Sequence, residues 1–193
     1  MFTQALVTTL RIIIFRAGPE DFPYDASHRL SLACIGFAIL ATGTLCALQA
    51  SPAVAIVSAL LNIGMLALAL RATLGARKML NRFQQAFNAL LATTSVLTLA
   101  IVPFFIQVLP AYRELAAKLT QNPNLAQQPD QISAIVSPVA GPFFVIFVLL
   151  LWQLAVIGYV FYKAAGSVAL FVLLGLLLLS VLLVPMAGGG AIG

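Results

Sequence analysis

The 193-residue chain contains very few charged side chains. Asp, Glu, Lys and Arg make up only 8% of it, with five carboxylates and one histidine, whereas soluble domains carry about 25% charged residues. So few charges do not cover the surface of a soluble protein, and they provide no clustered basic face for nucleic acid. They also supply little of the chemistry that most enzymes need. We therefore expect neither a soluble domain, nor a disordered chain, nor a nucleic-acid-binding protein.

Cysteine is also scarce. Cys34 and Cys46 lie twelve positions apart within one apolar run. On a single helix this separation corresponds to about 18 Å, which is far beyond the reach of a disulfide. We interpret both as small packing residues.

Apolar residues are abundant: they make up 62% of the chain, and the mean hydropathy is +1.09. A helix that crosses a bilayer needs about 20 mostly apolar residues. Five stretches meet this requirement: 30–48, 52–70, 83–106, 142–162 and 167–185. The sequence therefore predicts an all-α integral membrane bundle of five transmembrane helices within residues 29–187. The alternative is four spans, with residues 30–70 forming a re-entrant hairpin.

Local signals indicate where the first two and the last two spans are separated. Ser51 is suited to an N-cap and Pro52 to the first helical position, which predicts a tight antiparallel hairpin. A single helix from residue 142 to residue 184 would be about 65 Å long, roughly twice the hydrocarbon thickness. Lys163 and Gly166 are therefore expected to mark a break. Three aromatics beside this break suit an interfacial belt: Tyr159, Phe161 and Tyr162.

The third span has its own boundary signals. Asn81 and Gln84 have the spacing of a capping box. Pro103 and Pro110 are expected to bend or end the helix. Residues 110–141 should then form an external loop, whose first half could be a short amphipathic helix at the outer interface.

The N-terminal segment, residues 1–28, is read as a separate cytoplasmic element. Leu6, Leu10 and Ile13 recur at helical spacing, but the segment is too short to span and too polar for a signal-peptide core. No cleavage site follows, so we expect it to remain in the mature protein as an amphipathic helix in the membrane interface. Gly18-Pro19 and Pro23 then predict a rigid turn.

Basic residues predict the orientation, because Lys and Arg concentrate in cytoplasmic loops. An N-terminus inside places eight of the ten basic residues in the cytoplasm: Arg11, Arg16, Arg29, Arg71, Arg77, Lys78, Arg82 and Lys163. Only Arg113 and Lys118 then lie outside. Five spans place the glycine-rich tail, residues 188–193, outside as well.

The predicted spans contain no Asp, Glu, His, Lys or Arg. Such residues mark proton relays and ion paths, so we expect no proton-coupled transporter, and no catalytic, cofactor-binding or metal-binding residue is assigned. A neutral polar face remains in the third span, formed by Asn88, Thr94, Ser95 and Thr98. It could line a solute path, but we favour helix packing and interhelical hydrogen bonds, which such residues commonly serve.

The segment before the first span is the densest polar feature of the chain. Its candidate docking residues for a cytoplasmic partner are Arg16, Glu20, Asp21, Tyr24 and Asp25. The favoured reading is structural: two prolines fix the turn, and the acids pair with Arg16 and Arg29. A metal site that includes His28 needs more ligands than this spacing offers.

Two segments resemble the Yip1-type multi-pass membrane proteins, in particular their bacterial relatives. Residues 77–95 (RKMLNRFQQAFNALLATTS) are similar to that family's basic loop, aromatic residue and alanine-rich span opening. Residues 152–158 (WQLAVIG), followed by Lys163, are similar to its fourth span and turn. The resemblance covers roughly residues 30–187 and implies a bacterial inner-membrane location and no catalytic residues. Residues 16–24 depart from the eukaryotic members, so no trafficking partner is implied.

These observations predict a non-enzymatic scaffold, assembly or partner-binding subunit. Its expected partners are the lipid bilayer, other membrane or cytoplasmic proteins, and possibly a second copy of itself, without nucleic acid or cofactor. The alternative is a small transporter or channel subunit for a neutral or hydrophobic solute, which would use the third span. An enzyme that acts on lipid is the least favoured reading.

Overall fold

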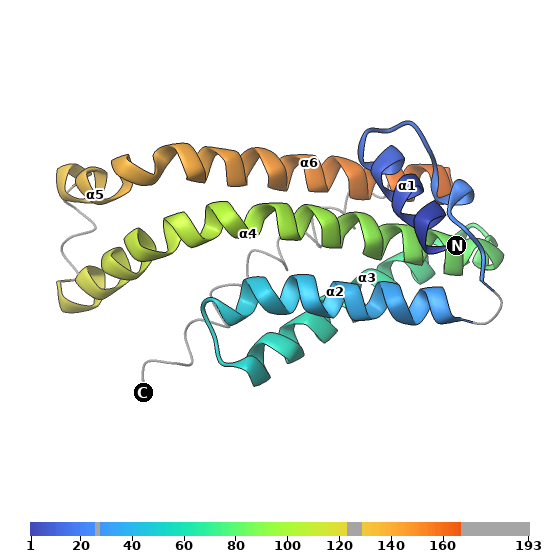
Figure 1. The fold of residues 1–193 in the computed structure, drawn as a ribbon, viewed down its shortest axis with the longest axis horizontal. Helices are drawn as coiled ribbons and strands as arrows, with labels where there is room; N and C mark the ends of the chain where they lie inside the picture. Colours follow the sequence, from blue (N-terminus) through green and yellow to red (C-terminus); the bar gives the residue numbers. More distant parts are fainter. Residues whose placement is uncertain (26–27, 123–128, 167–193) are drawn as a thin grey trace. The chain divides into compact units, whose positions relative to one another are not determined.

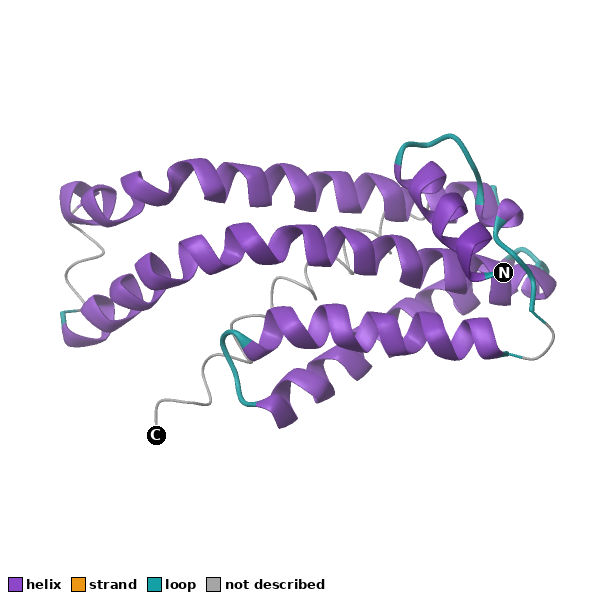
Figure 2. Cartoon of the chain, in the orientation of Figure 1, coloured by secondary structure: helices purple, strands orange, loops and turns teal. Residues whose placement is uncertain are grey.

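The computed structural model describes residues 1–25, 28–122 and 129–166, and every regular element in these ranges is helical (Figure 2). The elements are α1 (Phe2–Ile13), η1 (Pro19–Asp21), α2 (Arg29–Ala47), α3 (Pro52–Ala76), η2 (Leu80–Arg82), α4 (Phe83–Gln121), α5 (Pro129–Val136), η4 (Ser137–Val139) and α6 (Ala140–Ala165). The chain divides into two compact units. Unit 1 comprises Met1–Leu99 and the chain from Trp152 onward, and unit 2 comprises Ala100–Leu151.

The described part of the chain contains four helical segments that are long and apolar enough to cross a membrane: Arg29–Ala47, Pro52–Ala76, Leu80–Gln121 and Gln131–Ala165. The predicted all-helical fold is therefore confirmed, and these helices are consistent with a multi-pass membrane protein. The predicted fifth span, residues 167–185, and the glycine-rich tail lie outside the described residues.

Helices α2 and α3 form the predicted hairpin and lie side by side (Figure 1). Ser51 occupies the N-cap of α3 in extended conformation, and Pro52 is its first helical residue. Proline is favoured there because the first helical N–H has no partner within the helix. Ala55 and Ala59 are fully buried on α3, as expected where small residues allow two helices to approach closely.

Helix α4 corrects two expectations. It continues through Pro103 and Pro110 to Gln121, so Pro110 does not end the helix. The first half of residues 110–141 is helical, as the alternative expectation allowed, but it continues α4 to Gln121 instead of forming a separate helix. Residues 129–136 are also helical, as α5, so the loop expected for the second half is wrong there. A proline removes one intrahelical hydrogen bond, and this loss does not end a helix in a membrane, where the other backbone groups have no better partner.

The capping box predicted at Asn81 and Gln84 is also wrong. A 3₁₀ turn, η2, precedes α4, which begins at Phe83. The side chain of Gln84 turns to the start of α2, where its Nε2 donates a 2.8 Å hydrogen bond to the backbone carbonyl of Asp25. Gln84 therefore bonds to a residue distant in sequence, Asp25, instead of to the nearby residue that a capping box requires.

Helix α6 ends at Ala165, and Gly166 follows with φ of +72°. This left-handed conformation favours glycine and confirms the predicted break after Lys163. The predicted aromatic belt is wrong in part. Tyr162 is exposed, but Phe161 is buried in the hydrophobic core, and Tyr159 contacts the N-terminal segment.

Five helices of unit 1 share one end of that unit. The N-terminal ends of α2 and α4 and the C-terminal ends of α3 and α6 lie there, and α1 runs at an angle to them (Figure 1). A continuous core joins these helices, with fully buried residues on four of them: Ile12, Leu70, Leu74, Leu90, Leu91, Val156 and Val160. The N-terminal segment is therefore part of the packed unit.

Candidate functional site

Residues 1–25, which comprise α1, η1 and their connections, are called the N-terminal layer below. The end of α1 is attached to α6 by two aromatic side chains. Trp152 Nε1 donates a 3.1 Å hydrogen bond to the backbone carbonyl of Ile13, and the Tyr159 hydroxyl donates one of 3.4 Å to that of Phe15. The Phe15 ring lies 5.3 Å from the Trp152 ring and 5.1 Å from the Tyr159 ring, measured between centroids.

Phe15 adopts a left-handed conformation, with φ of 59°. This conformation is unfavourable for a bulky residue, and such residues persist only where their surroundings hold them in place. The two ring contacts and the hydrogen bond from Tyr159 supply that support. The reversal of the chain after α1 is therefore built from specific contacts with α6.

The second half of the layer is attached to α4 and α2. Phe22 is 1% exposed, and its backbone carbonyl accepts a 3.0 Å hydrogen bond from Gln85 Nε2. The Asp25 carboxylate is buried and accepts a 2.9 Å hydrogen bond from the backbone N–H of Leu30. A carboxylate is favoured at this position because the first N–H groups of α2 carry partial positive charge.

The structure separates the five candidate docking residues. Arg16, Glu20, Asp21 and Tyr24 are exposed, whereas Asp25 is buried and caps α2, so it does not offer its charge to a partner. The predicted pairing of Asp21 with arginine is wrong, because its carboxylate accepts a 2.8 Å hydrogen bond from the Gly18 N–H. Backbone amides at the turn have replaced the expected guanidinium groups.

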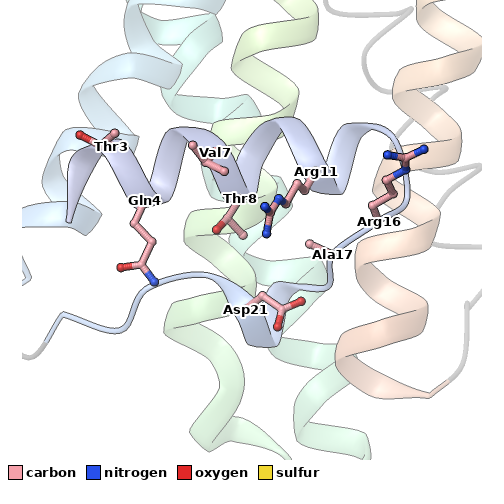
Figure 3. A pocket seen from close by; sticks show the side chains of 8 residues that line it. All are labelled: Thr3, Gln4, Val7, Thr8, Arg11, Arg16, Ala17 and Asp21. Atoms are coloured by element: carbon pink, nitrogen blue, oxygen red, sulfur yellow. The ribbon is translucent and has the colours of Figure 1, made fainter.

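A cavity of about 540 Å³ lies between α1 and the segment that contains η1 (Figure 3). Gln4, Thr8 and Arg11 point from α1 toward the η1 side (Figure 3). The full lining is Thr3, Gln4, Val7, Thr8, Arg11, Arg16, Ala17 and Asp21. Among the described residues, neither arginine has a carboxylate within ion-pair distance, in contrast to Lys118, whose Nζ lies 2.8 Å from Glu114 Oε1 in unit 2. The lining therefore includes two arginines without a carboxylate partner in the described part of the chain and one carboxylate; Arg11 points toward the η1 side, whereas the Arg16 guanidinium is directed away from Asp21 at the end of the cavity (Figure 3).

A second cavity, of about 310 Å³, lies where η1, the start of α4 and the end of α6 meet. Glu20 and Arg82 are the two charged residues in its lining, and both are exposed. The other lining residues are Pro19, Asn81, Gln85, Ala86 and Ala164. This cavity opens beside the exposed part of the predicted docking segment.

The predicted polar face of α4 is buried: Asn88, Thr94, Ser95 and Thr98 are each less than a tenth exposed. The Thr94 hydroxyl donates to the Leu90 carbonyl at 2.8 Å, and the Ser95 hydroxyl donates to the Leu91 carbonyl at 2.6 Å. These hydroxyls bond to their own helix, so they neither link helices nor point into a polar channel.

Asn88 differs from its neighbours. Its Nδ2 donates a 3.0 Å hydrogen bond to Ser31 Oγ on α2, which is the interhelical bond expected of this face. Its Oδ1 is buried without a hydrogen-bond partner in the described structure. Gln84 Nε2 lies 3.3 Å from both Ser31 Oγ and His28 Nδ1, so a small polar cluster joins the starts of α2 and α4.

The sequence did not assign to the N-terminal layer the residues that fix it: Gln84 and Tyr159 were given other roles, and Trp152 and Gln85 were given no structural role. The available signal was the polar pair Gln84-Gln85 at the start of an otherwise apolar span. Trp152 lies in the middle of α6, where no local pattern marks it. Across the described ranges, no three His, Cys, Asp or Glu side chains group closely enough to hold a metal ion.

Comparison of the chain with protein-family models, with curated proteins and with solved structures finds no match in any of the three.

Proposed function

We propose that this chain is a non-enzymatic, multi-pass membrane protein whose N-terminal layer forms a fixed docking surface for a cytoplasmic partner. The observation that carries the proposal is the attachment of the layer to the membrane helices through Trp152, Tyr159 and Gln85. A surface that is already ordered loses little conformational entropy when it binds. Glu20 and Tyr24 are exposed on it and have no structural task of their own in the described contacts.

The distribution of basic residues supports a cytoplasmic layer. The ends of α2, α3, α4 and α6 that meet in unit 1 carry or adjoin Arg29, Arg71, Arg77, Lys78, Arg82 and Lys163, and the layer adds Arg11 and Arg16. The turn between α2 and α3, residues 48–51, carries no charge. Because basic residues stay inside, we place the shared end in the cytoplasm. A fifth span at residues 167–185 then places the C-terminus outside.

The exposed face of α1 supports a place in the membrane interface. Phe2, Leu6, Leu10 and Ile14 follow one another at four-residue spacing and are all 51–64% exposed. The end of α1 contacts Tyr159 and Trp152, which lie six and thirteen residues before the end of α6 and so about 9 and 20 Å along that helix. The exposed apolar stripe of α1 supplies the face that an amphipathic helix buries at the boundary between headgroups and acyl chains.

One observation favours the alternative, a transporter or channel subunit. Asn88 Oδ1 lacks a partner, and buried polar atoms normally have one, so a passing solute could supply it. The neighbouring hydroxyls of Thr94 and Ser95 are already bonded within α4, however, and offer a solute no continuous path. The resemblance to Yip1-type proteins stays a prediction that adds no support to either function.

Purification of the full chain from native membranes tests the docking role. We expect a stoichiometric partner with the wild type, its loss with Glu20→Ala or Tyr24→Ala, and its retention with the control Tyr162→Ala, which removes an equally exposed tyrosine from α6. Retention of the partner by both layer variants would contradict the proposal. A shift of thermal stability caused by a neutral solute would instead favour the transporter.

A further inference from the structure

Helix α1 presents three different faces. Ala5, Thr9 and Ile12 are buried against unit 1, whereas Phe2, Leu6, Leu10 and Ile14 form an exposed apolar stripe. The third face carries Gln4, Thr8 and Arg11, which line the larger cavity. Thr3 and Val7 also line the cavity. At about 100° per residue they lie between Arg11 and the Leu10–Ile14 edge of the apolar stripe, so the cavity meets the stripe along that edge. A ligand with a polar head and an apolar tail matches this pairing.

The charged residues that line the cavity indicate which polar headgroup it binds. Arg11 and Arg16 are unpaired within the described structure, and a guanidinium binds phosphate through two parallel hydrogen bonds. Asp21 is partly satisfied by the Gly18 N–H. The amide of Gln4 and the hydroxyl of Thr8 add neutral hydrogen-bonding groups. The cavity volume, about 540 Å³, lies within the range of small-molecule sites.

We propose that this cavity binds the phosphate headgroup of an anionic phospholipid, whose acyl chains lie along the apolar stripe of α1. The lipid, rather than a free phosphate ester, is the favoured source, because the stripe adjoins the cavity. The site is preformed, since Trp152 and Tyr159 hold the end of α1 in place. This inference goes beyond the docking role and is measured on purified protein without a partner.

The test uses the full chain in detergent, with bound lipid counted by native mass spectrometry. Phosphatidylglycerol is titrated against phosphatidylcholine as the neutral reference. A hydrogen bond between charged groups contributes about 1.5 kcal/mol, which equals about tenfold in affinity. Arg11→Gln and Arg16→Gln should each weaken phosphatidylglycerol binding about tenfold, whereas the control Arg71→Gln, an exposed arginine on α3, should not.

A variant that should strengthen lipid binding distinguishes a specific effect from misfolding, which would only weaken binding. Asp21→Asn keeps an oxygen for the Gly18 N–H and removes the opposing charge, so it should strengthen phosphatidylglycerol binding. The proposal is overturned if phosphatidylcholine binds equally well, or if Arg71→Gln weakens binding as much as the cavity variants. It is also overturned if soluble glycerol phosphate displaces the lipid at equal concentration, which would identify a free phosphate ester as the ligand.

Discussion

The indole N–H of Trp152 donates a 3.1 Å hydrogen bond to the backbone carbonyl of Ile13, the last residue of α1. Both groups would otherwise need a partner. The last carbonyls of a helix have none within the helix, and an indole N–H within a membrane helix has no water to bind. This hydrogen bond therefore gives a partner both to the carbonyl of Ile13 at the end of α1 and to the indole N–H of Trp152 in the middle of α6. It explains why a polar atom lies at this depth.

Trp152→Phe tests the attachment of α1. The variant keeps an aromatic ring beside Phe15 but removes the N–H donor, so α1 should be held less tightly by about 0.5–1.5 kcal/mol. Hydrogen exchange of the amides of α1 should accelerate, while exchange in α2 and α3 stays unchanged. The control Tyr162→Phe alters an exposed side chain of the same helix. Equal exchange in Trp152→Phe and the control would show that the bond does not hold α1.

Asp25→Ala tests the cap of α2. Loss of the carboxylate that accepts the Leu30 N–H should lower the free energy of unfolding by about 1 kcal/mol. Asp25→Asn, which keeps an acceptor oxygen, should cost less. Thermal unfolding of the full chain in detergent is the measurement, with Glu20→Ala as the control because Glu20 is exposed. A cost of Glu20→Ala as large as that of Asp25→Ala would contradict the assignment of the cap.

Asn88→Leu separates the docking protein from the transporter. The variant removes one hydrogen bond to Ser31, worth about 0.5–1.5 kcal/mol, and an unpartnered acceptor that costs about 1–3 kcal/mol. Ser31 keeps Gln84 as a neighbour. Stability should therefore stay level or rise in thermal unfolding. A loss of several kcal/mol would show that Oδ1 is satisfied by a water or solute and would favour a polar path.

Thr94→Val and Thr98→Val test the rest of the polar face. The Thr94 hydroxyl bonds only to carbonyls of its own helix, so its loss breaks no hydrogen bond between helices, and even such an interhelical bond contributes only about 0.6 kcal/mol on average in membranes. Both variants should fold with almost unchanged stability, and the partner should still be retained in native purification. A Thr98→Val protein that folds normally but has lost its cellular activity would indicate that this face contacts a solute.

Hydropathy and turn residues predicted most of the membrane helices. Leu30 and Pro52 lie within one residue of the observed starts of α2 and α3, because long apolar runs and a proline at the first turn act locally. The break at Gly166 was predictable for a different reason: an uninterrupted helix would have been roughly twice as long as the hydrocarbon core is thick. The sequence did not show that α4 continues through Pro110. A proline favours the end of a helix by removing one backbone hydrogen bond, but in α4 the other backbone hydrogen bonds stabilise the helix more than this loss destabilises it.

The candidate site was predicted only in part. Arg16, Glu20 and Tyr24 were identified as exposed groups of the N-terminal segment, but Asp25 was counted with them although it caps α2. Its hydrogen-bond donor, the Leu30 N–H, is brought to the Asp25 carboxylate only by the folded turn before α2, which the sequence pattern does not reveal. The cavity that Arg11 shares with Arg16 depends on the reversal at Phe15. That reversal is fixed by Tyr159, 144 positions further along the chain.

The central claim is that the N-terminal layer lies on the cytoplasmic face of the membrane, and cysteine labelling tests it most directly. Tyr24→Cys is placed in a chain that also carries Cys34→Ala and Cys46→Ala, and is treated with a membrane-impermeant maleimide. We expect no labelling of intact cells and full labelling of inside-out vesicles, because Tyr24 is exposed beside the end of unit 1 that carries the basic residues. Labelling of intact cells, with inside-out vesicles protected, would contradict the claim.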